Sequence, residues 1–341
     1  VLANKTGNST SWETKFESII SNLVIQLEPT FTPTPVSDLV FAAVGDFGDK
    51  DKNEEEGIET WKNIANSNVS FLLALGDLTY IDDADEFINK SQELGKLTTN
   101  NIYPIIGNHD DKEDGDPKDR KKFLDTYTQP SVDMSKGYYS FTKGNIRFIM
   151  MDTQKPTSPN SDQYKFVEKE LKDAANDKQI KWKIVCYHKP SVVRKKLNLN
   201  DLSDWDEDTE FMEGEEKPPQ YIIVENYHTL FDTYGVDMVL SGHNHYLMVT
   251  YPLIHRGDPG DFTIVTNNTG PFNNVDGRIF VIVGSGGHEQ TSIGEATHLM
   301  YRNQNSGIMV LNLQENGTKL KCHYQPNEGD KMAEFELIKQ S

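Results

Sequence analysis

Short apolar segments alternate with amphipathic ones along the chain after residue 37. The apolar segments Leu39–Val44, Val69–Leu75 and Ile102–Ile106 have the length of buried strands, and each ends in a polar turn that contains glycine. Amphipathic stretches near Glu54–Ala65 and Asp83–Leu94 separate them and predict helices. This alternation is typical of βαβ units, in which helices cover a largely parallel sheet.

The rest of the chain predicts a hairpin, two further helices and many strands. A Lys-Gly-Asn turn joins apolar runs within Gly137–Asp152, as in a β-hairpin. Helices are expected near Asp162–Ala175 and Ile222–Tyr234. Strands are expected at Trp182–Tyr187, Val236–Leu240, Phe262–Val265, Arg278–Val283, Gly307–Leu313, Leu320–Tyr324 and Ala333–Ile338. We therefore expect an α/β fold, an α+β sandwich of two mixed β-sheets packed face to face and flanked by helices.

Residues 1–37 predict an N-terminal extension, and residues 38–341 predict one catalytic domain. Thr10 and Glu13 have the spacing of a capping box, and apolar residues recur at helical spacing from Trp12 to Val24. Three prolines between residues 29 and 35 then favour an extended linker. The expected amphipathic helix either packs on the catalytic domain or binds a partner.

The composition and net charge of the chain limit the classes of molecule that it is expected to bind. Hydrophobic residues make up 36% of the sequence, enough for a sizeable core, and the formal net charge is −19. Nucleic acids and anionic membranes require clustered lysine and arginine, so the charge disfavours both and leaves a small substrate as the expected partner. No apolar run approaches the about 18 residues of a membrane span.

Two features bear on the compartment of the protein. The only cysteines, Cys186 and Cys322, cannot form a disulfide framework, and Cys186 lies in an apolar stretch that predicts a buried free thiol. The chain begins with Val1 and contains six Asn-x-Ser/Thr sequons, which favour a secreted, extracellular or periplasmic glycoprotein. The sequons begin at Asn4, Asn8, Asn68, Asn89, Asn267 and Asn316.

Two acidic stretches, Asp110–Asp119 and Asp201–Glu216, are expected to be solvated loops. Calcium binding is the alternative for each. Neither stretch has the ordered spacing of ligands and glycine that a helix-loop-helix calcium site requires.

Five polar turns, each following or closing an apolar run, carry side chains of the types that can bind metal ions. The turns are Gly45-Asp46-Phe47-Gly48, Gly76-Asp77-Leu78-Thr79-Tyr80, Gly107-Asn108-His109-Asp110, Val185-Cys186-Tyr187-His188 and Gly242-His243-Asn244-His245. Three imidazoles, two carboxylates, an amide oxygen and a phenol suit first-row metals of intermediate hardness. Seven ligands are too many for one zinc ion but suit two metals that share a carboxylate, an arrangement used for phosphoryl hydrolysis.

In order, these turns match the GDxG, GDxxY, GNHD, VxxH and GHxH blocks of one family. The chain thereby resembles the small, single-domain purple acid phosphatases, within the calcineurin-like metallophosphoesterase superfamily. The resemblance spans residues 38–340 and implies that superfamily's fold. The larger members carry an additional N-terminal β-domain, for which residues 1–37 leave no room.

The resemblance also implies roles for individual residues. Asp46, Tyr80 and His245 would bind Fe(III), because a phenolate is a hard, anionic ligand. Asn108, His188 and His243 would bind a divalent ion (Fe, Zn or Mn), with Asp77 bridging the two metals. His109 would act as a general acid or transition-state hydrogen-bond donor. The two ions would leave the site net positive, which would attract phosphate to an acidic protein.

The chain departs from the family after His188. Many members place further histidines there, whereas this chain has Lys189, Pro190 and Arg194 and no histidine until His228. Lys189 or Arg194 could contact phosphate, although a solvated loop is the simpler expectation. Five histidines lie outside the motifs: His228, His255, His288, His298 and His323. His228 and His288 are expected to be structural, although His288 follows a glycine-rich turn that could approach the site.

The function that these residues imply is that of an acid phosphatase, a hydrolase of phosphate monoesters. A metal-bound hydroxide would attack phosphorus in line while His109 assists the leaving alkoxide. A phosphodiesterase acting on nucleotides or other small diesters is the alternative, because this scaffold serves both chemistries. A non-enzymatic surface or scaffold protein that keeps the fold is a further alternative.

Overall fold

The computed structural model describes residues 37–48, 54–81, 83–111, 117–128, 132–192, 219–256 and 261–340. The expected N-terminal helix and linker, Arg194 and the acidic stretch Asp201–Glu216 lie outside these ranges.

Two seven-stranded mixed sheets form the centre of the described chain. In spatial order the first sheet is β11 (Phe272–Asn273), β16 (Met332–Ile338), β15 (Lys319–Pro326), β14 (Gly307–Gln314), β1 (Leu39–Val44), β2 (Phe71–Leu75) and β3 (Ile102–Ile105). The second is β13 (Leu299–Asn303), β8 (Leu247–Thr250), β12 (Ile279–Val283), β7 (Met238–Ser241), β6 (Trp182–Cys186), β5 (Ile146–Met150) and β4 (Tyr139–Lys143). A small antiparallel pair, β9 (Leu253–His255) and β10 (Phe262–Ile264), lies outside both sheets.

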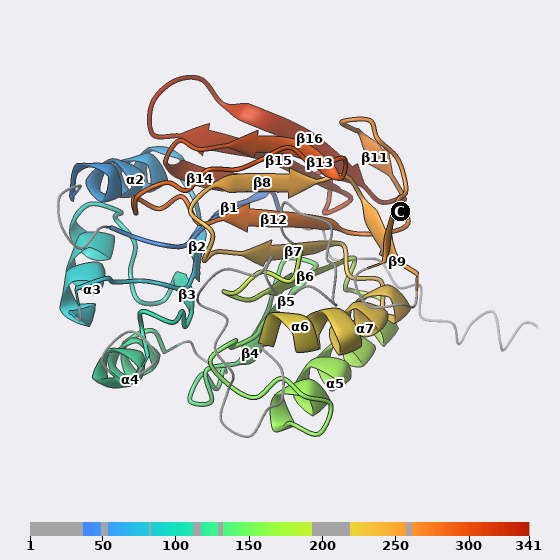
Figure 1. Ribbon diagram of the computed structural model, residues 1–341, viewed down its shortest axis with the longest axis horizontal. Coiled ribbons are helices and arrows are strands. Elements are labelled where there is room, and N and C mark those ends of the chain that lie inside the picture. The colour runs from blue at the N-terminus through green and yellow to red at the C-terminus, as the bar shows by residue number, and fades with distance from the viewer. Residues whose placement is uncertain are drawn as a thin grey trace, which may run out of the picture. The chain divides into compact units, whose positions relative to one another are not determined.

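Helices gather in two groups, one for each sheet (Figure 1). The first group is α2 (Glu54–Asn66), α3 (Ala84–Glu93) and α4 (Pro117–Thr126), and the second is α5 (Asp162–Asn176), α6 (Pro219–Ile222) and α7 (His228–Thr233). Apolar residues of α2, α3 and α4 join the core cluster that both sheets share, whereas those of α5 and α7 form a separate cluster with the second sheet. The expected sandwich of two mixed sheets flanked by helices is confirmed.

Aromatic side chains join the two sheets. The ring of Phe41 on β1 stacks on Phe71 of β2 at 4.8 Å between centroids, and meets Phe148 of β5 edge-on at 5.4 Å. Phe148 in turn stacks on Phe141 of β4 at 4.8 Å. All four rings are almost fully buried, so they fix the separation of the sheets and hence the relative positions of the strand ends.

The predicted strand β1 has the observed bounds, and most other predicted elements differ by one to three residues at their ends. The prediction of one helix at Ile222–Tyr234 was too simple, because Ile223–Tyr227 is a π-helical segment between α6 and α7. The short elements β8, β9, β11, β13 and α4 were not predicted. They have two to ten residues and little apolar periodicity.

The expectation of a solvated loop was wrong for the described acidic residues after β3. Asp110 and Asp119 are buried, and both accept hydrogen bonds from backbone N–H groups. Asp111 is buried too, and it pairs with Arg120. These carboxylates stabilise the turns around them, since burial without such partners would be unfavourable.

Two remaining expectations concern the thiols and the membrane. Both Cys186 and Cys322 are buried free thiols, as predicted for Cys186. No helix among the described residues has the length and apolarity that crossing a membrane requires.

Candidate metal centre

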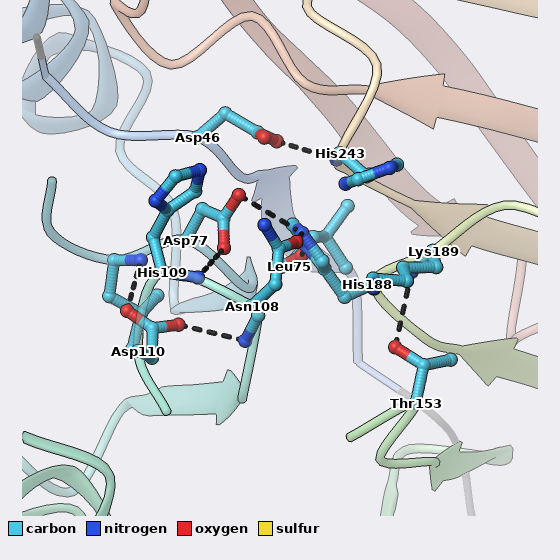
Figure 2. A network of polar contacts seen from close by, with 12 residues as sticks. Asp46, Leu75, Asp77, Asn108, His109, Asp110, Thr153, His188, Lys189 and His243 are labelled. Atoms are coloured by element: carbon cyan, nitrogen blue, oxygen red, sulfur yellow. Dashed lines mark hydrogen bonds and ion pairs between the residues drawn. The ribbon is translucent and has the colours of Figure 1, made fainter. Parts of the chain in front are cut away.

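Both sheets contribute to one cluster of polar side chains at the carboxyl ends of their parallel strands. Asp46 follows β1, Asp77 and Tyr80 follow β2, and Asn108 and His109 follow β3. From the second sheet, His188 follows β6, and His243 and His245 follow β7. Figure 2 shows Asp46, Asp77, His188 and His243 converging across the seam between the sheets.

Tyr80 is the centre of one half of the cluster. Its buried hydroxyl lies 3.2 Å from Oδ1 of Asp46, 3.3 Å from Oδ2 of Asp77 and 3.1 Å from Nε2 of His245. Two carboxylates, a phenol and an imidazole therefore point to one small volume.

His188 is the centre of the other half. Its Nε2 lies 3.1 Å from the side-chain oxygen of Asn108 and 3.1 Å from Oδ2 of Asp77. The potential ligand atoms of Asp77, His188 and His243 all lie within 4.8 Å of one another. Asp77 thus belongs to both halves through the same carboxylate.

Two of the imidazoles are oriented by backbone carbonyls. Nδ1 of His188 is 2.8 Å from the carbonyl oxygen of Leu75, and Nδ1 of His245 is 3.0 Å from that of Glu289. A neutral imidazole that donates Nδ1–H to a carbonyl presents the lone pair of Nε2 on its other side. Both Nε2 atoms face the cluster, and this fits a site built for metal ions.

Unusual backbone geometry positions the cluster. Asp46, Asp77 and His243 have φ values of 63°, 48° and 69°, which non-glycine residues rarely adopt. Gly76 has φ 87°, and a Cβ atom there would lie 2.4 Å from Nδ1 of His188. At Gly107 the corresponding Cβ would lie 2.0 Å from Oδ1 of Asp77. Glycine is required at both positions because a donor side chain occupies the space.

The electrostatics of the cluster reflect buried acids beside imidazoles. Burial, with the carboxylates of Asp46 and Asp77, raises the pKa of Tyr80 well above its usual value. Burial alone would also raise the pKa of Asp77, but the imidazole of His188 outweighs this and lowers it. In return, Asp77 overcomes the burial of His188 and raises the pKa of that imidazole to about 9.

His109 lies beside the cluster. Its backbone N–H donates to Oδ1 of Asp77 at 3.0 Å, and its partly exposed ring contacts that of Tyr80 at 4.4 Å between centroids. It can therefore reach a molecule bound over the cluster.

Asp110 had no predicted role in the cluster, and Lys189 was expected to lie in a solvated loop or to contact phosphate. The buried carboxylate of Asp110 accepts hydrogen bonds from the N–H groups of Leu78, Thr79 and Gly107, and so ties two donor-bearing turns together. Its position at the end of the GNHD block was the feature of the sequence that could have indicated this role. Lys189 is 1% exposed, so the expectation of a solvated loop was wrong at this residue.

His288 also reaches the site. Its ring lies 4.0 Å from that of Tyr80 and 4.3 Å from that of His245, between centroids. The glycine-rich turn before it was the sequence signal. His228 and His255, by contrast, pack against Phe262, and Nε2 of His228 lies 2.8 Å from the hydroxyl of Ser191.

Comparisons with known proteins agree with this architecture. Residues 39–247 match the family described as calcineurin-like phosphoesterase. Fe(3+)-Zn(2+) purple acid phosphatase 12 of Arabidopsis thaliana is 26% identical over 234 residues, covering 64% of this chain and 44% of that protein. An uncharacterised Mycobacterium tuberculosis protein is 26% identical over 242 residues, covering 64% of this chain and 42% of that protein.

Two solved structures show the same fold. The purple acid phosphatase PPD1 from yellow lupin (Lupinus luteus) has a TM-score of 0.72 at 19% identity, covering 89% of this chain and 54% of that one. GAP50, the anchor in the inner membrane complex of Plasmodium, has a TM-score of 0.54 at 16% identity and covers 85% of each chain. The chain spans less than half the length of the curated relatives above. Because the family match covers more than half of the chain and includes all five donor-bearing turns, the chain belongs to the calcineurin-like phosphoesterase family.

Proposed function

We propose that this protein is a purple acid phosphatase that hydrolyses phosphate monoesters at a dinuclear metal centre, with residues 38–341 as its catalytic domain. The observation that carries this proposal is the shared carboxylate. Oδ2 of Asp77 lies 3.3 Å from the hydroxyl of Tyr80 and 3.1 Å from Nε2 of His188, so one oxygen faces both halves of the cluster.

The donor atoms fit two different ions. Asp46, Tyr80 and His245 would hold Fe(III), since a phenol oxygen is a hard ligand once deprotonated. Asn108, His188 and His243 would hold a divalent ion (Fe, Zn or Mn), with Asp77 between the two. Paired ions in such a set supply positive charge for phosphate oxygens and lower the pKa of water.

His109 is the proposed general acid. Its backbone is held by Asp77, and its ring is partly exposed beside the cluster. From this position the imidazole can donate a proton to the oxygen of the departing alcohol. An acidic pH optimum is expected for such an enzyme.

The test is to compare turnover of nitrophenyl phosphate with that of bis(nitrophenyl) phosphate, using protein whose metal content has been measured. We expect two metal ions per chain and faster hydrolysis of the monoester. A large preference for the diester would make the protein a phosphodiesterase. Two bound metals without hydrolysis of either ester would favour a non-enzymatic surface or scaffold protein.

We also propose that the protein is exported and glycosylated. Four of the six sequon asparagines lie among the described residues, and all four are exposed: Asn68, Asn89, Asn267 and Asn316. Mass analysis of protein from its native source, before and after treatment with a glycosidase, tests this. An unchanged mass would contradict it.

A further inference from the structure

A cavity of about 310 Å³ lies next to the candidate metal centre. It opens to solvent and is lined by the start of α2, the loop after β12, and the turns β13–β14 and β15–β16. His288 lines this cavity, and its ring contacts those of Tyr80 and His245. One residue therefore borders both the cavity and the cluster.

The walls of the cavity offer hydrogen-bond acceptors and negative charge. Glu56, Glu289 and Glu328 line it, and the lining residues, all of them described, include neither lysine nor arginine. The amide nitrogen of Gln290 donates to the carbonyl oxygen of His288 at 2.9 Å. The amide oxygen of Gln290 is buried and accepts no hydrogen bond. That oxygen is closed to solvent, whereas the three glutamates are exposed, so their carboxylates are the acceptors that a ligand in the cavity can reach.

Other lining side chains are already fixed by the protein. The amide nitrogen of Asn327 donates to the backbone oxygen of Glu56 at 3.1 Å and to the hydroxyl of Thr60 at 3.0 Å, which ties the β15–β16 turn to α2. Gln304 donates to the backbone oxygen of Thr291 at 2.9 Å. The cavity is therefore preformed, and a ligand would not have to order these walls.

We propose that this cavity receives the alcohol portion of the substrate, and that the substrate is the phosphate monoester of a small amino alcohol. This inference rests on the proposed phosphatase function. The volume is at the lower end of the range for ligand sites and admits only a small group. A protonated amine supplies the positive charge and the hydrogen-bond donors that the three carboxylates attract.

Phosphoethanolamine and phosphoglycolate form a matched pair of substrates for the test, because their leaving alcohols are similar in size and opposite in charge. With metal-loaded protein, we expect kcat/KM for phosphoethanolamine to exceed that for phosphoglycolate by about tenfold or more. The double variant Glu289→Gln/Glu328→Gln should lower this ratio at least about fivefold, the effect of losing one close charge pair in water.

Glu55→Gln is the matched control, because it removes one charge from an exposed position next to Glu56 but outside the cavity lining. It should leave the ratio unchanged. Equal kcat/KM values for the two substrates, or an equal effect of Glu55→Gln, would overturn the inference.

A second measurement separates this inference from the proposed function. Binding of ethanolamine alone, followed by NMR line broadening on the unmodified protein, should be lost in the double variant. If neither ester is hydrolysed, the phosphatase proposal fails, and ethanolamine binding still decides the role of the cavity. Absence of ethanolamine binding would overturn the cavity assignment even in an active phosphatase.

Discussion

The hydroxyl of Tyr80 lies 3.1 Å from Nε2 of His245, although 165 residues separate them in the chain. Tyr80 follows a strand of the first sheet and His245 follows a strand of the second, so the contact depends on the packing of the two sheets. It brings a phenol oxygen into a set of metal-binding atoms, and the first prediction tests that oxygen.

Tyr80→Phe should remove a visible absorption band of the aerobically purified protein without unfolding it. The phenol oxygen is the charge-transfer donor to Fe(III) in our proposal, whereas the ring still packs against His109 and His288. The visible spectrum and elemental analysis measure the effect, and we expect a lower iron content. A colourless protein with two divalent ions, unchanged by the substitution, would exclude ferric iron and the purple acid phosphatase assignment while leaving the phosphoesterase reading standing.

Asp77→Asn and His109→Ala should have different effects on metal content. Asp77 faces both halves of the cluster, so Asp77→Asn should weaken binding of both ions and abolish activity. His109→Ala should keep both ions and lower kcat by about 10²–10⁴-fold, the range for loss of a general acid. Equal metal loss in both variants, measured by elemental analysis, would show that His109 is a ligand.

Gly76→Ala should weaken metal binding, whereas Gly48→Ala should leave it unchanged. Both glycines have φ 87°, so an alanine at either position introduces the same backbone strain. This strain should lower the free energy of unfolding by about 1–2 kcal/mol in both variants. Only at Gly76 does the added Cβ meet a ligand, since it would lie 2.4 Å from Nδ1 of His188, whereas nothing lies within 4 Å at Gly48. Retention of both metals in Gly76→Ala would contradict the tight fit.

The free energy of unfolding should fall as the pH drops below about 6.5, partly because of His228. Burial, with the electrostatic influence of the nearby Arg278 and His255 side chains, lowers the pKa of His228 well below its usual value. The imidazole is therefore neutral in the folded protein and takes up a proton on unfolding. Stability from this residue is complete above the unfolded pKa and is lost below it, by at most about 1.4 kcal/mol per pH unit.

Urea unfolding of the protein and of His228→Gln at pH 7.5, 6.5 and 5.5 measures this contribution. The variant should show a shallower loss of stability between pH 6.5 and 5.5. Identical pH dependence in the two proteins would mean that the imidazole is protonated in the folded state.

The strands that precede the candidate donor residues could be predicted from the sequence alone. Each donor follows a run such as Leu39–Val44 within a few residues, so local pattern and motif spacing placed it at a strand end. The sandwich also followed from pattern, because buried strands alternate with amphipathic helices in one part of the chain and cluster in the other.

Features that depend on tertiary packing could not be predicted. His288 reaches Tyr80 because the turn before it lies over β1's end, where a Cβ at Gly286 would be 2.4 Å from the carbonyl oxygen of Gly45. Nothing in the local sequence reports such a fit. Similarly, Asp110 lies in a stretch whose acidic composition predicts an exposed loop. In the folded chain three backbone N–H groups donate hydrogen bonds to its carboxylate, and these compensate for its burial.

The position of β1 has a consequence for the order in which the protein can assemble during synthesis. Residues 41–44 of β1 pair in parallel with β2 on one side, and residues 39–43 pair antiparallel with residues 309–313 of β14 on the other. During synthesis, β2 therefore follows β1 closely, whereas β14 is complete only after some 270 further residues have been translated. Until then one edge of β1 has unpaired backbone groups, and nascent chains stalled before β14 should depend on chaperones to remain unaggregated.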